Sequence, residues 1–301
     1  MKILVSGSHG LVGSALIPFL KTGGHEIVRL VRSNAVGPNQ IRWDMEKQLI
    51  DTAALEGFDA VIHLAGENIA NGRWSAAKKK KIFDSRVHGT RFLADTLAKL
   101  DSPPKVFISA SAIGYYGNAG DEILSEVSDP GKGFLADTCW NWESASDALK
   151  QKDVRVVHAR FGVVLSPKGG ALAQMLPIFQ LGGGGPLGNG KQYLSWVALD
   201  DVVGALGFLL NKPDAEGPYN IVGPEPVSNK EYSRTLGKVL MRPAFAPVPG
   251  LAVRAMFGEM GDELLLSSTR VEPARLQETG YKFQCPTLER ALRQVLGQKV
   301  A

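Results

Sequence analysis

Short apolar runs alternate along the chain with longer segments whose apolar residues recur every three or four positions. The short runs are rich in β-branched residues and predict strands at 2–6, 26–31, 40–43, 59–64, 105–110, 154–159 and 219–222. Runs such as ILV at 3–5 and AVIHLA at 60–65 are apolar at nearly every position, so both faces of these strands should be buried. Strands of this kind, separated by helices, predict an α/β protein with a doubly wound parallel sheet.

The clearest helical pattern covers residues 74–100. One face of this predicted helix carries, at helical spacing, Ile82, Phe83, Val87, Thr90, Leu93, Ala94 and Leu97. A second helical pattern covers 196–211, in the sequence WVALDDVVGALGFLLN. The four lysines at 78–81 point mostly away from the apolar face of the first helix, and we expect them to be solvated.

The pattern of the sequence changes after residue 165, where glycine and proline begin to interrupt the periodic segments. Strand patterns become rare after residue 223 and proline becomes more frequent. We therefore predict a Rossmann-type domain from 1–165 and 196–223. A smaller, partly helical C-terminal lobe from 166–195 and 224–301 would lie on the substrate side.

Composition limits the partners and the location that we expect. The net charge is only +4, and the run of lysines has no stacking aromatic residues beside it, so nucleic acid is not an expected partner. No apolar stretch approaches the roughly 18 residues of a membrane span, and the N-terminus lacks a signal-peptide cleavage site. We expect a cytoplasmic protein that does not contact membranes.

Cysteine and histidine give no sign of a metal. The two cysteines, Cys139 and Cys285, lie far apart and outside any CxxC motif, so they predict neither a disulfide framework nor a zinc site. The five histidines are scattered without ligand spacing. We assign no metal.

A glycine-rich loop follows the first predicted strand, and a helix begins near Leu11. Gly7 would allow the tight turn, Gly10 the approach of backbone amides to a pyrophosphate, and Gly13 the close packing of the helix on the sheet. The loop predicts a dinucleotide site made of Gly7, Ser8, His9, Gly10, Leu11, Val12 and Gly13. The alternative is a turn that packs the helix on the sheet and binds nothing.

Two arginines bear on which dinucleotide would bind. Arg32, followed by Ser33, ends the second predicted strand, where a protein that prefers NAD usually has an acidic residue; an arginine there suits a 2′-phosphate and favours NADP(H). Arg86 falls near the buried face of the helix over 74–100, and a buried guanidinium needs an anion. That anion could be a cofactor phosphate or an internal carboxylate, or the side chain could reach water.

Four motifs resemble the extended and atypical short-chain dehydrogenase/reductase superfamily over about residues 1–225. They are GSHGLVG at 7–13, VIHLAG at 61–66, RVHGT at 86–90 and SASAIGYYG at 109–117. The segment from 247 to 283, PVPGLAVRAMFGEMGDELLLSSTRVEPARLQETGYKF, is similar to the C-terminal segment of the epimerase-family, sugar-nucleotide-epimerase-like group. The resemblance implies a Rossmann fold that binds NADP(H) and, from the helices after the fourth and fifth strands, a homodimer. It adds as cofactor-binding residues Asp44, Leu64, Ala65, Gly66, Arg86 and Val163.

The catalytic residues depart from the family pattern. Members of the superfamily carry a tyrosine four residues before a lysine and a glutamate four residues after it; aligning that glutamate with Glu143 places Leu135 and Cys139 at the other two positions. Neither residue can move a proton as tyrosine and lysine do. We expect Tyr115 or Tyr116 to donate the proton instead, with Ser111 bonding the substrate oxygen, unless these residues only pack and cap a turn.

Contacts with a small-molecule substrate, which the sequence does not identify, are expected from Arg73 and Trp74 in the loop after the fourth strand, and from Trp196. Two functions fit these features. The first is an NADP(H)-dependent oxidoreductase or epimerase-like enzyme acting on a carbonyl or hydroxyl group. The second is a non-catalytic NADPH-binding sensor or partner-binding protein, which the missing tyrosine and lysine favour.

Overall fold

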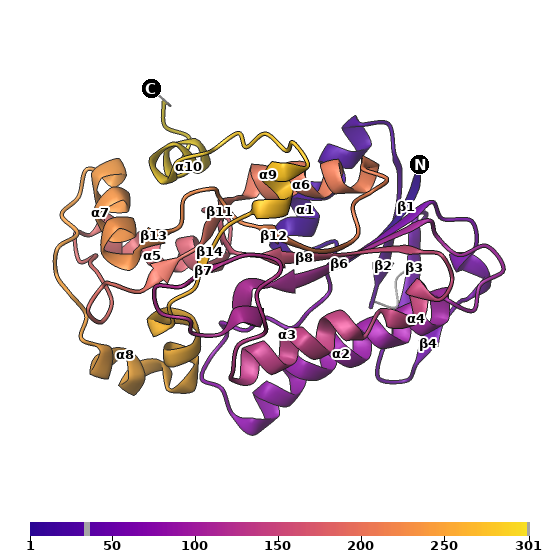
Figure 1. The fold of residues 1–301 in the computed structure, drawn as a ribbon, viewed down its shortest axis with the longest axis horizontal. Coiled ribbons are helices and arrows are strands. Elements are labelled where there is room, and N and C mark those ends of the chain that lie inside the picture. Colours follow the sequence, from indigo (N-terminus) through magenta and orange to yellow (C-terminus); the bar gives the residue numbers. More distant parts are fainter. Residues whose placement is uncertain (33–36, 300–301) are drawn as a thin grey trace.

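The computed structural model describes residues 1–32 and 37–299, and its centre is an eight-stranded sheet (Figure 1). The strand order is β12-β8-β6-β5-β1-β2-β3-β4, and every neighbouring pair is parallel except β3 and β4. The strands are β1 (Lys2–Ser6), β2 (Glu26–Val31), β3 (Gln40–Asp44), β4 (Leu49–Ile50), β5 (Ala60–His63), β6 (Val106–Ala112), β8 (Arg155–Phe161) and β12 (Gly217–Ile221).

The order of the strands reverses at β1. The chain proceeds from β1 to β2 and β3 on one side, and then returns to place β5 on the other side of β1. Ligands of doubly wound folds bind outside the carboxyl ends of the strands at such a switch point. The loops that follow β1 and β5 therefore lie at the edge where a ligand is expected.

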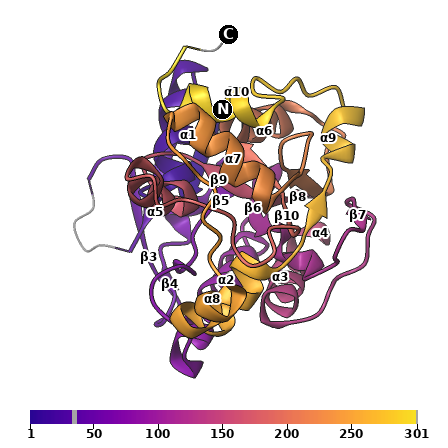
Figure 2. The same ribbon diagram turned by 90° about the vertical axis from the view of Figure 1, so that its left-hand side faces the viewer.

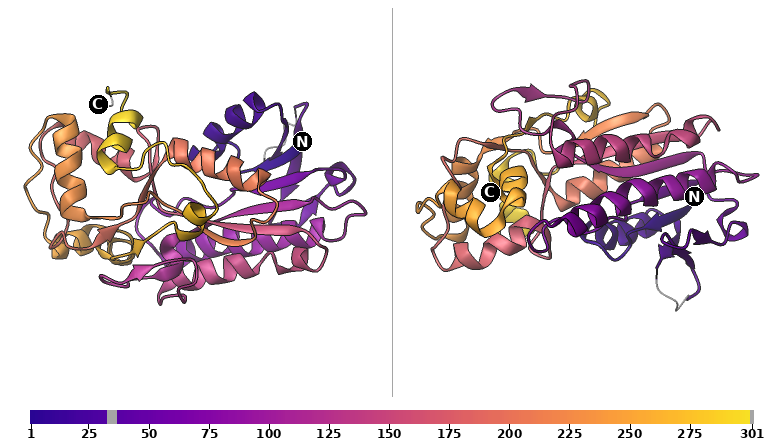
Figure 3. Two further views of the ribbon diagram at one scale, coloured as in Figure 1. Left: turned by 45° about the horizontal axis from the view of Figure 1, so that its top comes forward. Right: turned by 90° about the horizontal axis from the view of Figure 1, so that it is seen from below.

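Helices cover both faces of the sheet, as the continuous apolar strands predict (Figures 1 and 3). On one face, β-strand residues such as Ile62 pack against α1 (Leu11–Thr22) and α6 (Leu199–Asn211). On the other, Val61 and its neighbours pack against α2 (Ala76–Leu97) and α4 (Asp147–Lys150), with α3 (Phe134–Ser144) beside α2. Within the described residues, no helix combines the length and the apolar character that crossing a membrane requires.

A separate hydrophobic cluster forms beyond β8, where the chain continues through β9 (Val163–Leu165) into a group of helices at one end of the molecule (Figures 1 and 2). This cluster includes side chains from α5 (Gly170–Gln180), α7 (Asn229–Leu240) and α10 (Leu288–Val295). The residue boundaries of the two lobes remain a prediction. The other helices of the C-terminal part are α8 (Gly250–Phe257), a π-helix (Gly261–Leu266) and α9 (Ala274–Glu278).

The predicted strands are all confirmed, and those at 2–6 and 26–31 agree with β1 and β2 at both ends. The prediction for 196–211 is wrong at its start, because residues Trp196–Ala198 form β11, which pairs with β9, and the helix begins only at Leu199. A short apolar run is compatible with either a helix or a strand, and here pairing with β9 makes the first three residues a strand. Short strands that the sequence did not predict are β4, β9, β7 (Ile123–Leu124), β10 (Tyr193–Leu194), β13 (Val227–Ser228) and β14 (Arg270–Val271).

Candidate functional site

The loop between β1 and α1 has the backbone geometry that requires glycine at two positions. Gly7 has φ of +66°, and a β-carbon there would lie 2.6 Å from the carbonyl carbon of Leu64. A β-carbon on Gly13 would overlap the carbonyl oxygen of Gly7. The loop is closed by a hydrogen bond of 2.9 Å from the amide of Gly10 to the same carbonyl. The turn is therefore tight and lies against the segment that follows β5.

The N-terminus of α1 is open to an anion. Its capping residue is Gly10, no side chain caps it, and its first turn carries no acidic residue. Amide groups at the start of a helix, together with the helix dipole, favour negative charge. The hydroxyl of Ser8 is buried and lies 3.3 Å from Nδ1 of His9, so backbone amides are the groups that this loop offers.

Buried polar contacts hold the end of β5 against this loop. The hydroxyl of Ser6 accepts hydrogen bonds from the amides of Leu64 and Ala65, at 3.1 and 3.3 Å, and lies 2.7 Å from Nδ1 of His63. The His63 ring is fully buried between aromatic neighbours, and burial lowers its pKa to about 4, so the imidazole is neutral. The segment from 64 to 66 is thereby fixed beside Gly7.

Arg86 projects from α2 toward the same segment. Its Nη1 donates to the carbonyl oxygens of Glu67, at 3.0 Å, and Ile82, at 3.3 Å. Its guanidinium lies over the indole of Trp142, 5.1 Å from the ring centre. Among the residues that the structure describes, no carboxylate forms an ion pair with it, and burial lowers its pKa. The internal carboxylate partner that the sequence allows for Arg86 is therefore not present among the described residues.

The remaining predicted cofactor residues lie around this edge of the sheet. Arg32 is exposed at the end of β2, and Ser33 lies outside the described residues. Asp44 ends β3, where its carboxylate accepts a hydrogen bond of 3.0 Å from the amide of Lys47. Val163 begins β9, just beyond β8. Their roles as cofactor contacts remain predictions.

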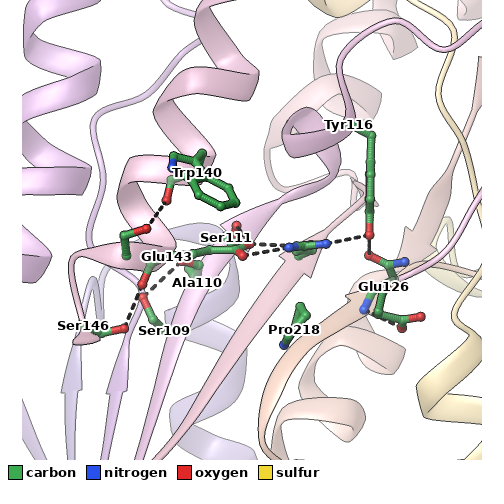
Figure 4. A network of polar contacts seen from close by, with 12 residues as sticks. Ser109, Ala110, Ser111, Tyr116, Glu126, Trp140, Glu143, Ser146 and Pro218 are labelled. Carbon is green, nitrogen blue, oxygen red and sulfur yellow. Dashed lines mark hydrogen bonds and ion pairs between the residues drawn. The ribbon is translucent and has the colours of Figure 1, made fainter. Parts of the chain in front are cut away.

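A buried polar network occupies the ends of β6 and β8 (Figure 4). Arg160 on β8 donates from Nε and Nη2 to the two carboxylate oxygens of Glu143 on α3, at 2.7 and 2.8 Å. The hydroxyl of Ser111 on β6 donates to the same carboxylate at 2.7 Å. We call these contacts, together with those of Tyr116 and Asn220 described next, the Glu143–Arg160 network. The two parallel hydrogen bonds between the guanidinium of Arg160 and the carboxylate of Glu143 hold both side chains in one orientation.

The Tyr116 hydroxyl is committed to this network. It accepts a hydrogen bond of 2.9 Å from Nη1 of Arg160 and donates one of 2.7 Å to Oδ1 of Asn220. Burial raises the pKa of Tyr116 to about 12, although Arg160 opposes the shift. The prediction of Tyr116 as a proton donor does not fit this placement, because its proton is already bonded inside the protein.

Tyr115 remains as the tyrosine candidate. Its ring stacks on the guanidinium of Arg160, 3.5 Å from the ring centre, and packs edge-on against Tyr116. The side chain is 6% exposed, and burial raises its pKa, with Arg160 acting in the opposite direction. A phenol with a raised pKa is protonated at neutral pH; it can still donate its proton, as a weaker acid than free tyrosine, but it cannot act as a base there.

The positions of the family's tyrosine and lysine lie on α3 and face η2 (Ile113–Tyr116). A β-carbon on Gly114 would lie 3.3 Å from Cβ of Leu135 and 3.7 Å from Sγ of Cys139. Burial raises the pKa of the Cys139 thiol to about 12, so it is neutral at physiological pH. Neither residue supplies acid–base chemistry. Across the described residues, no three His, Cys, Asp or Glu side chains come together in a way that could hold a metal ion.

The three predicted substrate contacts lie in different surroundings. Arg73 is exposed beside Gly258, just after α8. Trp74 acts as a packing anchor: its indole donates a hydrogen bond of 2.7 Å to the carbonyl of Ile69, and its ring packs edge-on against Phe134. Trp196 is only 1% exposed, and its indole donates to the carbonyl of Glu225, so it lies in the C-terminal core where substrate cannot reach it.

Reasoning from the sequence did not find Arg160, Asn220 or Glu126. Asn220 on β12 accepts a hydrogen bond from the Tyr116 hydroxyl, and its backbone amide donates to the Glu126 carboxylate at 2.9 Å. Figure 4 labels Tyr116 and Glu126. A signal was present in the sequence VVHARF, because an arginine inside an apolar strand must have a buried partner. Its partner Glu143 is predicted from the sequence only as the residue that aligns with the family's glutamate, and not as the partner of an arginine.

Comparison with known families matches almost the whole chain. The model of the NAD dependent epimerase/dehydratase family matches residues 3–222, and that of a domain of unknown function, DUF1731, matches 248–295. An epimerase family protein of Mycobacterium bovis is 43% identical over 290 residues, which cover 96% of each of the two proteins.

Two solved structures have a similar fold. The human epimerase family protein SDR39U1 (isoform 2), crystallised with NADPH, is 34% identical with a TM-score of 0.90, over 99% of each chain. A nucleoside-diphosphate sugar epimerase from Corynebacterium glutamicum is 36% identical with a TM-score of 0.80, over 99% of this chain and 58% of that one.

Proposed function

The chain belongs to the NAD dependent epimerase/dehydratase family, and from this premise we propose that it binds NADPH and acts as an oxidoreductase on a carbonyl or hydroxyl group. One observation carries the proposal: the uncapped N-terminus of α1, under a loop in which Gly7 and Gly13 have no room for a side chain. A helix start of this kind suits a pyrophosphate. The crystal structure of the human relative with NADPH supports the choice of dinucleotide.

The residues present fit this cofactor. Backbone amides of 10–13 would face the pyrophosphate, and Arg32, at the end of β2, would bind the 2′-phosphate that distinguishes NADPH from NADH. Arg86, whose Nη1 donates to carbonyl oxygens and to no carboxylate among the described residues, would contribute a further positive charge. When bound, NADPH would supply a hydride to a substrate carbon.

Reduction of a carbonyl needs a proton donor. The pKa of Tyr115 is raised, so its phenol is protonated at neutral pH and has a proton to give, although the same shift makes it a weaker acid than free tyrosine. The Ser111 hydroxyl donates its hydrogen to Glu143, so the predicted hydrogen bond from Ser111 to a substrate oxygen does not fit this placement. We assign Tyr115 as the proton donor.

Titration with NADPH and NADH, followed by fluorescence, tests the cofactor assignment. We expect Arg32→Ala to weaken NADPH binding by about 10- to 100-fold, the effect of losing a charged hydrogen bond, and to leave NADH binding almost unchanged. Arg91→Ala, which removes an exposed arginine from α2, is the matched control and should bind as the wild type does. Absence of NADPH binding by the wild-type protein would overturn the proposal.

A second candidate is an NADPH-binding protein without catalytic activity. The observation that favours it is the pair Leu135 and Cys139, which are neutral and packed against Gly114 where the family has tyrosine and lysine. Loss of NADPH absorbance with members of a panel of aldehydes and ketones, abolished by Tyr115→Phe, would support the enzyme. Tight NADPH binding with no turnover on any member would favour this second function.

A further inference from the structure

Large apolar side chains are exposed at the end of the molecule where α5 and α7 lie (Figures 1 and 2). Ile178 in α5 and Leu181, directly after it, are 57% and 88% exposed. Met241 and Phe245, in the segment that follows α7, are 82% and 81% exposed. We call these four side chains the apolar edge. Exposed apolar side chains that gather in one place mark sites of contact with other molecules.

The two segments that carry the apolar edge lie side by side. Nε of Arg242 donates a hydrogen bond of 2.9 Å to the carbonyl oxygen of Gln180. Further along, a β-carbon on Gly185 would overlap the carbonyl oxygen of Ala246. The exposed residues of one segment are therefore neighbours of those of the other, and Arg242 lies among them.

Met241 has a backbone conformation that its residue type disfavours. It ends α7 with φ of +53° and ψ of +43°, in the left-handed region, where glycine or asparagine is usual after a helix. The other described residues with positive φ that are not glycine are Asn39, Gln48 and Asp153, all polar. Met241 thus lowers stability without the packing that would offset this loss, as expected for a side chain that another molecule covers.

The chain segments that form the apolar edge carry positive side chains and no negative ones. Residues 161–199 and 232–258 contain no Asp or Glu, although the whole chain has 30 acidic residues. Lys238 is paired with Glu289 of α10, whereas Arg242 forms no ion pair with a carboxylate of the described residues. A second copy of the chain placed on this edge would bring like charges together, so the complementary partner is an acidic one.

We propose that the apolar edge binds an amphipathic helix of another protein, which has apolar residues on one face and Asp or Glu beside them. Methionine, aromatic residues and arginine are enriched in protein interfaces and lysine is depleted, and the run from Met241 to Phe245 contains all three favoured kinds and no lysine. A helix end and a loop form the edge, so it offers no open strand to which an extended peptide could add. The carboxylates of the partner would meet Arg242.

Two labelled peptides test the proposal by fluorescence anisotropy. The acidic probe has leucines at helical spacing and glutamates elsewhere, and the basic probe has lysine in place of each glutamate. We expect the wild type to prefer the acidic probe and Leu181→Ser/Phe245→Ser to bind it about 10- to 100-fold more weakly, the effect of losing interface hot spots. Arg242→Glu should reverse the preference. Leu49→Ser, which changes an exposed leucine on β4, is the matched control and should bind as the wild type does.

Met241→Gly separates binding from stability. Glycine adopts the left-handed conformation freely, so this variant should unfold at a higher urea concentration than the wild type. It should also bind the acidic probe more weakly, because an apolar contact is gone. A variant that is more stable and binds equally well would overturn the proposal.

Other outcomes overturn the proposal by naming a different occupant. Equal binding of the two probes, or no binding of the acidic probe by the wild type, would exclude the acidic helix. Binding to vesicles of phosphatidylcholine and phosphatidylglycerol that is lost in Leu181→Ser/Phe245→Ser would identify an anionic membrane. A dimer that sedimentation detects in the wild type and not in this variant would identify a second copy. The edge variants should keep the NADPH affinity of the wild type, so this inference stands or falls independently of the proposed function.

Discussion

Two regions at the carboxyl edge of the sheet use their polar groups in opposite ways. At the glycine loop no side chain caps the N-terminus of α1, and at Arg86 the hydrogen bonds found among the described residues all come from Nη1 and go to carbonyl oxygens. In the Glu143–Arg160 network, each nitrogen of the Arg160 guanidinium has an oxygen acceptor, and the Tyr116 hydroxyl both gives and receives a hydrogen bond. Both regions carry residues that a sequence motif marks as functional. Only the first has binding capacity to spare.

The difference separates ligand binding from structural support. A buried polar group that is fully paired stabilises one conformation, and it has no hydrogen bond left to offer a ligand. The network ties α3, β6, β8 and β12 together through Glu143, Ser111, Arg160 and Asn220. Tyr115 belongs partly to each region, because its ring is held on Arg160 while the raised pKa keeps its phenol protonated.

The largest effect should come from breaking the network. Arg160→Met leaves the Glu143 carboxylate with the Ser111 hydrogen bond but without a countercharge, and removes a donor to Tyr116, so we expect a loss of about 3–5 kcal/mol in the free energy of unfolding. Urea denaturation measures it. In the double variant Arg160→Met/Glu143→Leu the uncompensated charge is gone, and much of the stability should return. A single variant within 1 kcal/mol or so of the wild type would show that the network is not structural.

Substitution of Gly7 in the glycine loop should cost less stability than breaking the Glu143–Arg160 network, and it should abolish NADPH binding. Gly7 and Gly57 both have positive φ, of +66° and +74°, but only Gly7 has backbone within reach of an added β-carbon. Gly57→Ala should cost about 1 kcal/mol from conformation alone, and Gly7→Ala about 2–4 kcal/mol because Leu64 must also move. Denaturation and NADPH titration check both. Equal costs for the two variants would contradict the close approach.

The sequence predicts the parts of this molecule that depend on local pattern. The strands around β1 and β5 follow from continuous apolar runs, and the loop from glycines at a strand-to-helix turn. Trp196 shows the limit for the fold: its apolar run suits a helix, and pairing of β11 with β9 makes it a strand. Tyr116 shows the limit for the site, because the motif that contains it does not reveal that Asn220 and Arg160 use its hydroxyl.

The smallest expected effect concerns the pH dependence of stability, to which each region contributes one buried histidine that can be compared directly. Burial lowers the pKa of both His63, beside the glycine loop, and His158, next but one to Arg160 on β8, to about 4. The folded state resists protonation that the unfolded chain accepts near pH 6.5, so stability is complete above that pH and falls as the pH falls toward 4. Between about pH 7.5 and 5.5 each histidine should cost about 1 kcal/mol.

Denaturation midpoints of the wild type, His63→Asn and His158→Asn at these two pH values measure each share. Each variant should reduce the wild-type change in stability between these two pH values by about 1 kcal/mol. Burial is the largest cause of the lowered pKa of both histidines; at His158 the charge of Glu143 opposes it, and the charges of Lys150 and Arg160 add to it. We therefore expect similar losses from His63→Asn and His158→Asn. A smaller loss from His158→Asn would show that Glu143 outweighs the two cations at that ring, and no loss from either variant would contradict the neutral state of the two buried rings.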